Sequence, residues 1–260
     1  MNLSDLNAIA KKMVAPGKGL LAADESTGTI KKRFDAIGVE NTEENRRDYR
    51  EFLFRTEVAM KGHISGVILY DETIRQKAKD GTPLVKLIEA NGAIPGIKVD
   101  KGAKPLAAAP DEMVTEGLDG LRERFQEYYK LGARFAKWRA VIDISPKIPT
   151  YNCINANAQA LARYAALAQE NGIVPIVEPE VLMDGDHDIA RCSEVTTRVL
   201  KEVFQELFYA NVALEGMILK PNMIVPGMKC AKQNTAQEVA EATVRVLREC
   251  VPSAVPGGLG

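Results

Sequence analysis

The sequence has few cysteines and no paired cysteine motif. Its 260 residues include four cysteines, Cys153, Cys192, Cys230 and Cys250, which are far apart and form no CxxC pair. Such spacing argues against a disulfide scaffold and against a zinc site. It favours reduced thiols, and we therefore expect a cytoplasmic location.

Long apolar runs and an excess of one charge are also missing. No run approaches the roughly 20 apolar residues that span a bilayer, and residues 1–12 lack the apolar block of a secretory signal. Thirty-four basic and 35 acidic residues give a net charge of −1. We therefore expect no membrane and no nucleic acid as partner, although local basic pockets for anionic substrates remain possible.

Two phosphate-loop motifs are absent as well. The chain contains neither GxGxxG nor GxxxxGK[ST], and the apolar run 19–23 is followed by Asp24-Glu25-Ser26-Thr27-Gly28 instead. An open nucleotide-binding sheet carries a glycine-rich loop after its first strand. The composition, 46% hydrophobic and 27% charged, is that of an ordinary globular protein, either one α/β barrel or two smaller domains.

Short apolar runs alternate with helix-like segments along the whole chain. This alternation predicts a parallel sheet with right-handed crossovers, in an eight-stranded barrel or in a doubly wound sheet. The predicted strands are 19–23, 65–70, 94–100, 135–142, 173–178 and 217–219, and the predicted helices are 3–13, 42–58, 83–90, 118–131, 155–170, 189–209 and 235–250.

Charged residues at the strand ends decide between these two folds. Asp24, Lys98, Lys137, Glu178 and Lys220 lie in or at the carboxyl ends of five predicted strands. The carboxyl ends of barrel strands face one axis, whereas an open sheet places ligands mainly at one switch point. We therefore predict a single barrel-type domain over residues 1–260.

Lys220 is the strongest candidate for a catalytic group. It closes the apolar run 217–219, and Pro221 ends the strand because proline cannot donate to a sheet ladder. Desolvation and a nearby cation lower the pKa of a lysine and free its amine as a nucleophile. A Schiff-base lysine is the role that this position suggests.

Structural roles compete with catalytic ones at each position. Lysines at strand ends are usually solvated. Lys137 and Arg139, which alternate onto one strand face, are also suited to a structural ion network with nearby carboxylates. His63 and His187 are expected on the surface or in loops rather than as ligands.

Six segments near the strand ends form a specific combination. They are 21–28 (LAADESTG), 40–47 (ENTEENRR), 96–102 (GIKVDKG), 135–139 (FAKWR), 176–180 (IVEPE) and 219–223 (LKPNM). Together they resemble class I fructose-bisphosphate aldolase, and the similarity runs from about residue 10 to residue 257. The resemblance implies a (β/α)8 barrel, reversible cleavage of fructose 1,6-bisphosphate, no metal or other cofactor, and a homotetramer.

The resemblance also implies a role for each site residue. Lys220 would form the Schiff base, Glu178 would move protons, Lys137 would disfavour protonation of Lys220, and Asp24 would take the C4 hydroxyl proton. The polar contacts to the sugar phosphate would come from Ser26, Thr29, Lys98 and Arg139, with Lys32 and Arg33 nearby and Glu180 as an electrostatic partner.

The end of the chain departs from the family pattern. Only six complete βα units can be counted before Gly260, so we expect a barrel truncated before its last two strands. Two other functions therefore stay open. One is a noncatalytic aldolase fragment or scaffold, and the other is a lysine-dependent aldolase acting on another sugar phosphate.

Overall fold

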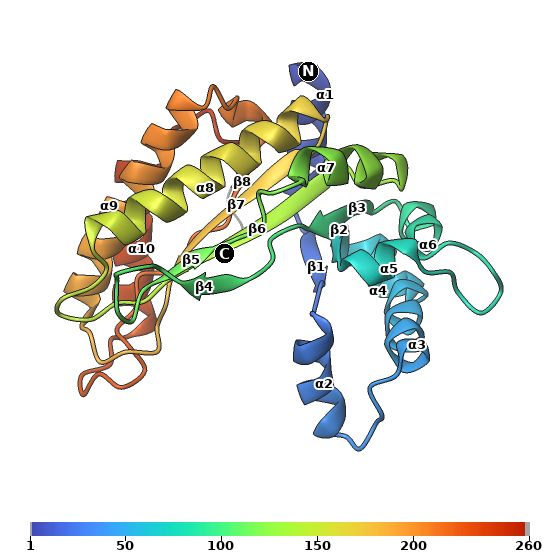
Figure 1. Cartoon of the computed structure of the whole chain (residues 1–260), viewed down its shortest axis with the longest axis horizontal. Helices are drawn as coiled ribbons and strands as arrows, with labels where there is room; N and C mark the ends of the chain where they lie inside the picture. The colour runs from blue at the N-terminus through green and yellow to red at the C-terminus, as the bar shows by residue number, and fades with distance from the viewer. Residues whose placement is uncertain (1, 258–260) are drawn as a thin grey trace.

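The computed structural model describes residues 2–257, which form a parallel sheet flanked by helices (Figure 1). Its six strands lie in the order β1-β2-β3-β6-β7-β8. The order of these strands in the sheet is therefore the same as their order along the chain. The predicted α/β alternation is therefore confirmed. The strands are β1 (Gly19–Ala23), β2 (Ile64–Leu69), β3 (Ile94–Lys98), β6 (Phe135–Ile142), β7 (Val174–Val181) and β8 (Ile218–Leu219).

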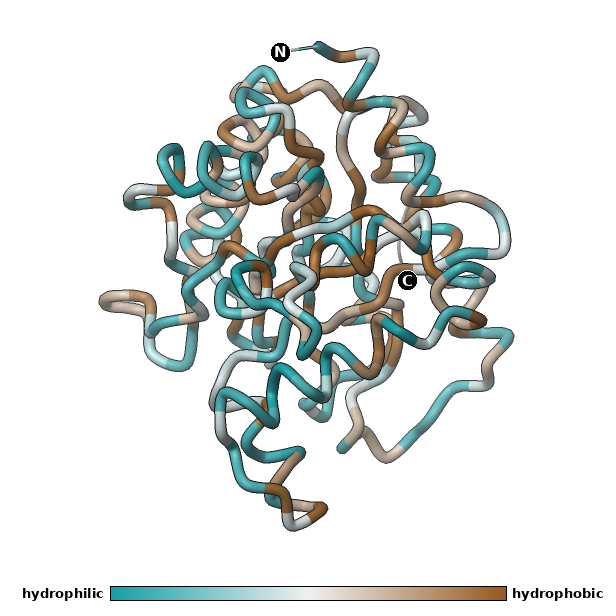
Figure 2. The backbone as a smooth tube through the Cα atoms, turned by 90° about the vertical axis from the view of Figure 1, so that its right-hand side faces the viewer, coloured by the Kyte–Doolittle hydropathy of each residue, from teal (hydrophilic) through white to brown (hydrophobic). Residues whose placement is uncertain are grey.

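Helices return the chain between the strands, and α8 and α9 pack on each other and on β7. Apolar segments run through the middle of the molecule, whereas the outer helices alternate apolar and polar residues (Figure 2). Side-chain caps begin the three long helices, from Thr150, Asp188 and Thr235. The helices are α1 (Leu3–Met13), α2 (Thr27–Asp35), α3 (Glu43–Phe54), α4 (Glu57–His63), α5 (Asp71–Arg75), α6 (Leu84–Ala90), α7 (Leu121–Lys130), α8 (Tyr151–Glu170), α9 (Ile189–Tyr209) and α10 (Ala236–Cys250), with a 3-10 turn η1 (Leu214–Gly216).

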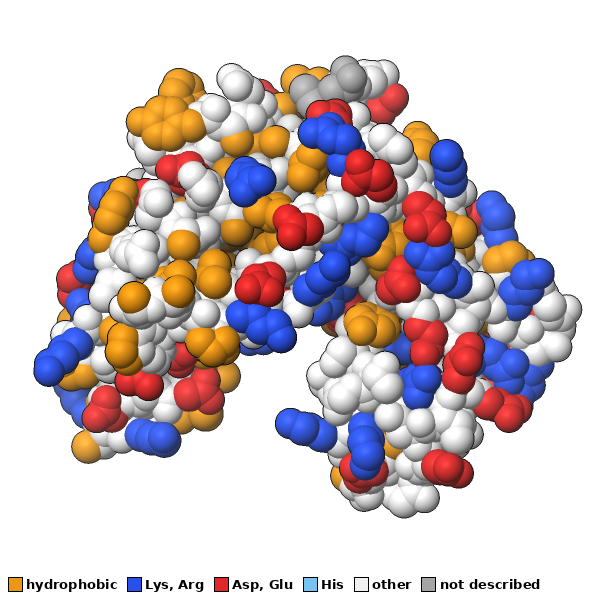
Figure 3. Space-filling model, viewed as in Figure 1, with side chains coloured by type: hydrophobic (Ala, Val, Ile, Leu, Met, Phe, Trp, Pro, Cys, Tyr) orange, Lys and Arg blue, Asp and Glu red, His pale blue; other side chains and the backbone are white. Residues whose placement is uncertain are grey.

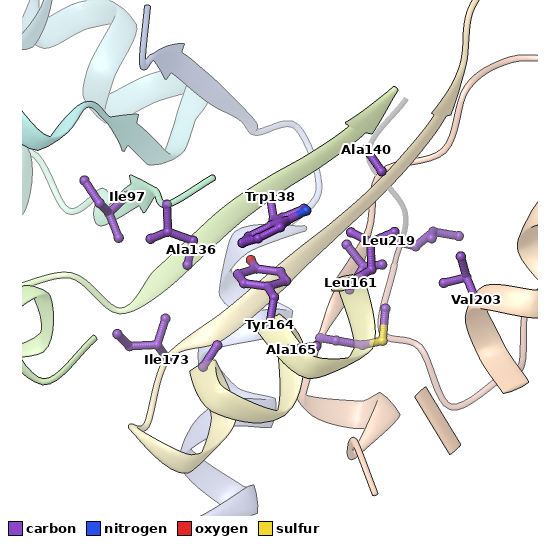
Figure 4. Close-up of a cluster of buried hydrophobic side chains, with 14 of the residues drawn as sticks. Ile97, Ala136, Trp138, Ala140, Leu161, Tyr164, Ala165, Ile173, Val203 and Leu219 are labelled. Carbon is purple, nitrogen blue, oxygen red and sulfur yellow. The ribbon is translucent and has the colours of Figure 1, made fainter. Parts of the chain in front are cut away.

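The outer face of the sheet packs against the helices in a large apolar core. Trp138 of β6 stacks on Tyr164 of α8 with ring centroids 5.5 Å apart, and both side chains are fully buried (Figure 4). The Tyr164 hydroxyl donates to the Ile176 carbonyl of β7. Trp138 therefore packs between sheet and helices, on the face opposite Lys137, as the strand alternation predicts.

The inner face has a second apolar core at the amino ends of the strands. Phe135, Ile176 and Ile218 meet there, and α1 closes this end with Leu6 and Met13. The close approach of Phe135 requires glycine at position 96, because a Cβ there would lie 2.3 Å from ring atoms. The amino end of the interior is thus filled with side chains.

Two local predictions were wrong. The predicted helix 42–58 is two helices, because α3 ends at Phe54 and the Thr56 hydroxyl donates back to the Phe52 carbonyl. The predicted loop after β3 contains an antiparallel hairpin of β4 (Ala103–Pro105) and β5 (Met113–Thr115). Its strands are too short to show a period in the sequence.

His187 was predicted on the surface or in a loop. It lies in the connection between β7 and α9, but its side chain is buried. The segment around Gly227 covers it, since the Gly227 amide donates to the His187 carbonyl at 2.8 Å. Among residues 2–257, no helix combines the length and the hydropathy that crossing a membrane requires.

Candidate active site

The carboxyl ends of the strands surround one cavity of about 570 Å³. It opens on the face where the α2 side of the molecule stands apart from the β4–β5 side, and Figure 3 shows a deep notch there. The predicted convergence of charged strand ends is confirmed. The charged and hydroxyl side chains of the cavity are Asp24, Glu25, Ser26, Thr29, Arg33, Lys98, Asp100, Lys137, Arg139, Glu178, Glu180 and Lys220.

Strand register explains why these residues meet. In the ladder between β3 and β6, Lys98 is paired with Lys137, and between β6 and β7, Arg139 is paired with Glu178. Alternate residues of a strand share a face, so Lys137 and Arg139 both point to the interior above Phe135. β3, β6 and β7 thus contribute charged side chains at neighbouring levels of the sheet interior.

Lys220 lies at the end of β8 beside a buried carboxylate. Its backbone amide donates to the Val177 carbonyl at 2.9 Å, which holds the residue against β7. Its Nζ donates to Oε1 of Glu178, whose side chain is only 2% exposed. The Lys220 side chain is itself 38% exposed, so the amine remains accessible from the cavity.

Lys137 bridges two carboxylates from opposite sides of the cavity. Its Nζ donates to Oδ2 of Asp24 at 3.1 Å and lies 3.6 Å from Oε2 of Glu178. Burial alone lowers the pKa of this lysine, but the charges of Asp24 and Glu178 outweigh it and hold the pKa above its ordinary value. Lys137 is therefore an ammonium ion at neutral pH.

Arg139 stands next to these groups and is less buried. Its Nε donates to Oε2 of Glu180 at 2.5 Å and lies 4.0 Å from Oε1 of Glu178. The hydrogen bond to Glu180 raises the pKa of the guanidinium. The prediction of Glu180 as an electrostatic partner in the pocket fits this contact.

The amino end of α2 supplies the hydroxyl side of the cavity. Ser26 caps the helix by accepting from the Thr29 amide at 3.3 Å, and the two hydroxyl oxygens are 3.0 Å apart. Arg33, one helical turn after Thr29, also lines the cavity and pairs with Glu25. Lys32 does not line it and is exposed, because one residue along a helix turns the side chain by about 100°.

Two cavity carboxylates were not predicted as site residues. Glu25 is 8% exposed and holds Arg33, while Asp100 forms an ion pair with Lys98 at 2.9 Å. Asp100 also accepts from the Gly102 amide at 3.1 Å. Their sequence signal was similar to that of Asp24, namely an acidic residue at or just after the carboxyl end of a predicted strand.

The chemistry of the cavity is that of paired lysines and carboxylates. Within residues 2–257, no group of three or more His, Cys, Asp or Glu side chains has the arrangement that holds a metal ion. The buried Glu178 carboxylate lies near three cations, those of Lys137, Arg139 and Lys220. The arrangement can activate an amine and move protons at a carbonyl carbon.

Comparison with known proteins places this geometry in a family. Residues 5–259 match the family model described as fructose-bisphosphate aldolase class-I. The chain is 60% identical over 257 residues to a probable fructose-bisphosphate aldolase class 1 of Xanthomonas campestris, a match that covers 99% of this chain and 77% of the relative. It is 54% identical over 253 residues to human fructose-bisphosphate aldolase C, covering 97% of this chain and 70% of the relative.

A solved structure agrees. The aldolase of Plasmodium falciparum, crystallised with TRAP and a small-molecule inhibitor, superposes with a TM-score of 0.95 at 50% identity. The match covers 99% of this chain and 74% of that chain, and it confirms the predicted barrel fold. These matches cover about three quarters of each of these two relatives, without showing which part is unmatched. The expected absence of two strands therefore stays a prediction. The chain belongs to the class I fructose-bisphosphate aldolase family.

Proposed function

We propose that this chain catalyses the reversible cleavage of fructose 1,6-bisphosphate into dihydroxyacetone phosphate and glyceraldehyde 3-phosphate through a Schiff base on Lys220. Family membership supports the reaction. The observation that carries the mechanism is the contact between the Lys220 amine and the buried Glu178 carboxylate, with Lys137 on the other oxygen of the same group.

The first steps join the substrate to the enzyme. Lys220 gives a proton to Glu178, and the neutral amine attacks the C2 carbonyl of the open-chain sugar. Glu178 then protonates the departing hydroxyl of the carbinolamine, and water leaves as the iminium forms. The Lys137 ammonium disfavours a second positive charge on Lys220 and supports the negative charge of the two carboxylates around it.

Cleavage follows from the iminium. Asp24 accepts the proton of the C4 hydroxyl, the C3–C4 bond breaks, and its electron pair moves into the iminium to give an enamine. Glyceraldehyde 3-phosphate leaves first. Protonation of the enamine at C3 and hydrolysis of the resulting iminium release dihydroxyacetone phosphate and restore the amine.

The phosphate contacts in this proposal come from the hydroxyl and cationic side chains around the acid–base centre. Ser26 and Thr29 offer hydroxyl donors at the amino end of α2, where the helix dipole also favours an anion. Lys98, Arg139 and Arg33 line the same cavity, each already paired with a carboxylate that a phosphate would have to compete with.

The setting of the enzyme is also a proposal. We infer a single domain without a metal cofactor and, by resemblance, a homotetramer in the cytoplasm. The four cysteines are free thiols in the structure, which suits a reducing compartment. If no metal cofactor takes part, cleavage should persist in excess EDTA. If the chain forms a homotetramer, its mass in solution should be that of four chains.

Reductive trapping tests the Schiff base. The protein is incubated with dihydroxyacetone phosphate and borohydride, and the modified peptide is identified by mass spectrometry. We expect one adduct, on Lys220, which persists in a Lys201→Arg control because Lys201 pairs with Glu249 on the surface. Folded protein without any adduct would favour the scaffold alternative, and faster cleavage of a monophosphate than of the bisphosphate would favour the other-substrate alternative.

A further inference from the structure

Arg50 is a fully buried cation behind the cavity rather than in it. It belongs to α3, its exposure is 0%, and it is not among the residues that line the cavity. A guanidinium removed from water is costly unless it is paired, so its contacts indicate what it stabilises.

The closest contact of Arg50 is with a backbone carbonyl. Its Nη2 donates to the Glu25 carbonyl oxygen at 2.8 Å. The carboxylates around it are farther away, with Oε2 of Glu25 at 3.7 Å and Oε1 of Glu72 at 3.9 Å. Nε and Nη1 have no hydrogen-bond partner among the described protein groups. The one short bond of this buried charge thus goes to the main chain of residue 25.

That carbonyl belongs to the loop between β1 and α2. β1 pairs with β2 up to Ala23, and the next three residues leave the ladder. They carry the Asp24 carboxylate that binds Lys137 and the Ser26 hydroxyl that caps α2. Fixing the peptide between residues 25 and 26 therefore fixes the direction of both side chains.

A neighbouring arginine of the same helix has a different partner. Arg46 binds Glu72 of α5 through two hydrogen bonds of 2.9 and 2.7 Å, and it also donates to Asn41. Within residues 2–257, the polar contacts of the Arg46 side chain are with Glu72 and Asn41 and do not include Glu25. It shares helix, charge and carboxylate partner with Arg50, and it lacks the contact with the loop.

We propose that Arg50 is a positioning residue for the cleavage step, which holds residues 24–26 so that Asp24 reaches Lys137 and the C4 hydroxyl of the substrate. This inference rests on the proposed function. Schiff-base formation depends on Lys220, which follows β8, and on Glu178 of β7, and the polar contacts of Arg50 are with Glu25 and Glu72 instead. Loss of Arg50 should therefore slow cleavage without reducing Schiff-base formation.

The experiment compares the whole wild-type chain with Arg50→Met, Arg50→Lys and Arg46→Met. Borohydride trapping with dihydroxyacetone phosphate measures the Schiff base, steady-state kinetics measure cleavage of the bisphosphate, and amide hydrogen exchange measures the order of residues 24–30. For R50M we expect unchanged trapping, a fall in kcat of roughly 10- to 100-fold with a smaller change in KM, and faster exchange. R50K should show the same pattern to a smaller degree, and R46M should resemble the wild type in all three measurements.

Several results would overturn the proposal. R50M cleaving as fast as R46M is one, and a parallel fall of trapping and cleavage is another, since that indicates a general structural loss. Should R50M not fold, R50K decides, and exchange of residues 24–30 equal to that of the wild type refutes the contact. Absence of trapping in the wild type would instead refute the proposed function, while the exchange measurement would still test Arg50.

Discussion

The amino and carboxyl halves of the sheet interior are built on the same strand faces but have opposite chemistry. On β6, apolar Phe135 is followed on the same face by Lys137 and Arg139, and on β7, Ile176 is followed by Glu178. At the amino end α1 closes the interior, and at the carboxyl end the interior remains a cavity. One strand therefore contributes to stability at one end and to chemistry at the other.

The two halves of the sheet interior affect the stability of the fold in different ways. Burial of Phe135 and Ile176 removes apolar surface from water and stabilises the sheet. Lys137 and Glu178, a few residues further along their strands, are almost as buried and would destabilise it if either lacked its partner. Substitutions in the two halves should therefore have different signatures.

The largest effect should come from the nucleophile. Lys220→Met removes the only group proposed to bind the substrate covalently, so kcat should fall by roughly 10⁴-fold or more. Trapping with borohydride should disappear while the thermal midpoint changes little, because Lys220 is partly exposed. Retained trapping at another lysine would contradict the assignment.

The apolar half should respond in stability alone. Phe135→Ala should lower the free energy of unfolding by about 3–5 kcal/mol, because it leaves a cavity beside Gly96 and α1. Urea titration measures the loss. The folded variant should still be trapped on Lys220, and a loss below about 1 kcal/mol would show that this core is not well packed.

Lys137 should make stability depend on alkaline pH. Its folded pKa lies above the ordinary value, so its ammonium contributes stability that is fully present below the unfolded pKa of about 10.4 and is lost as pH rises through the folded pKa. Above about pH 10, unfolding titrations of the wild type should therefore show a steeper fall than those of Lys137→Met, which keeps the part due to the raised pKa of the buried Cys153 thiol and Tyr164 hydroxyl. Phe135→Ala, two residues away, should keep the alkaline fall of the wild type.

The smallest effect is expected at the rim. Arg139 and Glu180 are 41% and 32% exposed, and ion pairs that are open to solvent contribute about 0–1 kcal/mol. Glu180→Gln should change the free energy of unfolding by no more than that. A loss of several kcal/mol in denaturant titrations would mean that Glu180 supports the site through more than its bond to Arg139.

Long periodic segments were predictable from local sequence. The predicted bounds of α9, 189–209, and of β6, 135–142, agree with the structure because each segment has a clear period and clear end signals. The hairpin β4–β5 and the break between α3 and α4 escaped prediction. Short strands and a single threonine bonded to the previous turn give too weak a local signal.

The composition of the site was also largely predictable. Every predicted site residue except Lys32 lines the cavity, since a polar residue at the end of a buried strand marks the same edge of a parallel sheet. The supporting arginine Arg50 was not predictable, because an arginine within a charged helix looks solvent-exposed in sequence. Its burial depends on how α3 lies against the loop after β1.

The sequence by itself determined the six strands of the parallel sheet, the charged groups at their ends and the family. Only the tertiary structure decided which charges neutralise one another, because those contacts join distant parts of the chain. Lys137 binds Asp24 across 113 residues, and Arg139 binds Glu180 across 41 residues. Pairing of charges depends on distance and on exclusion of water, and both are set by how the strands curve together and which helices cover them.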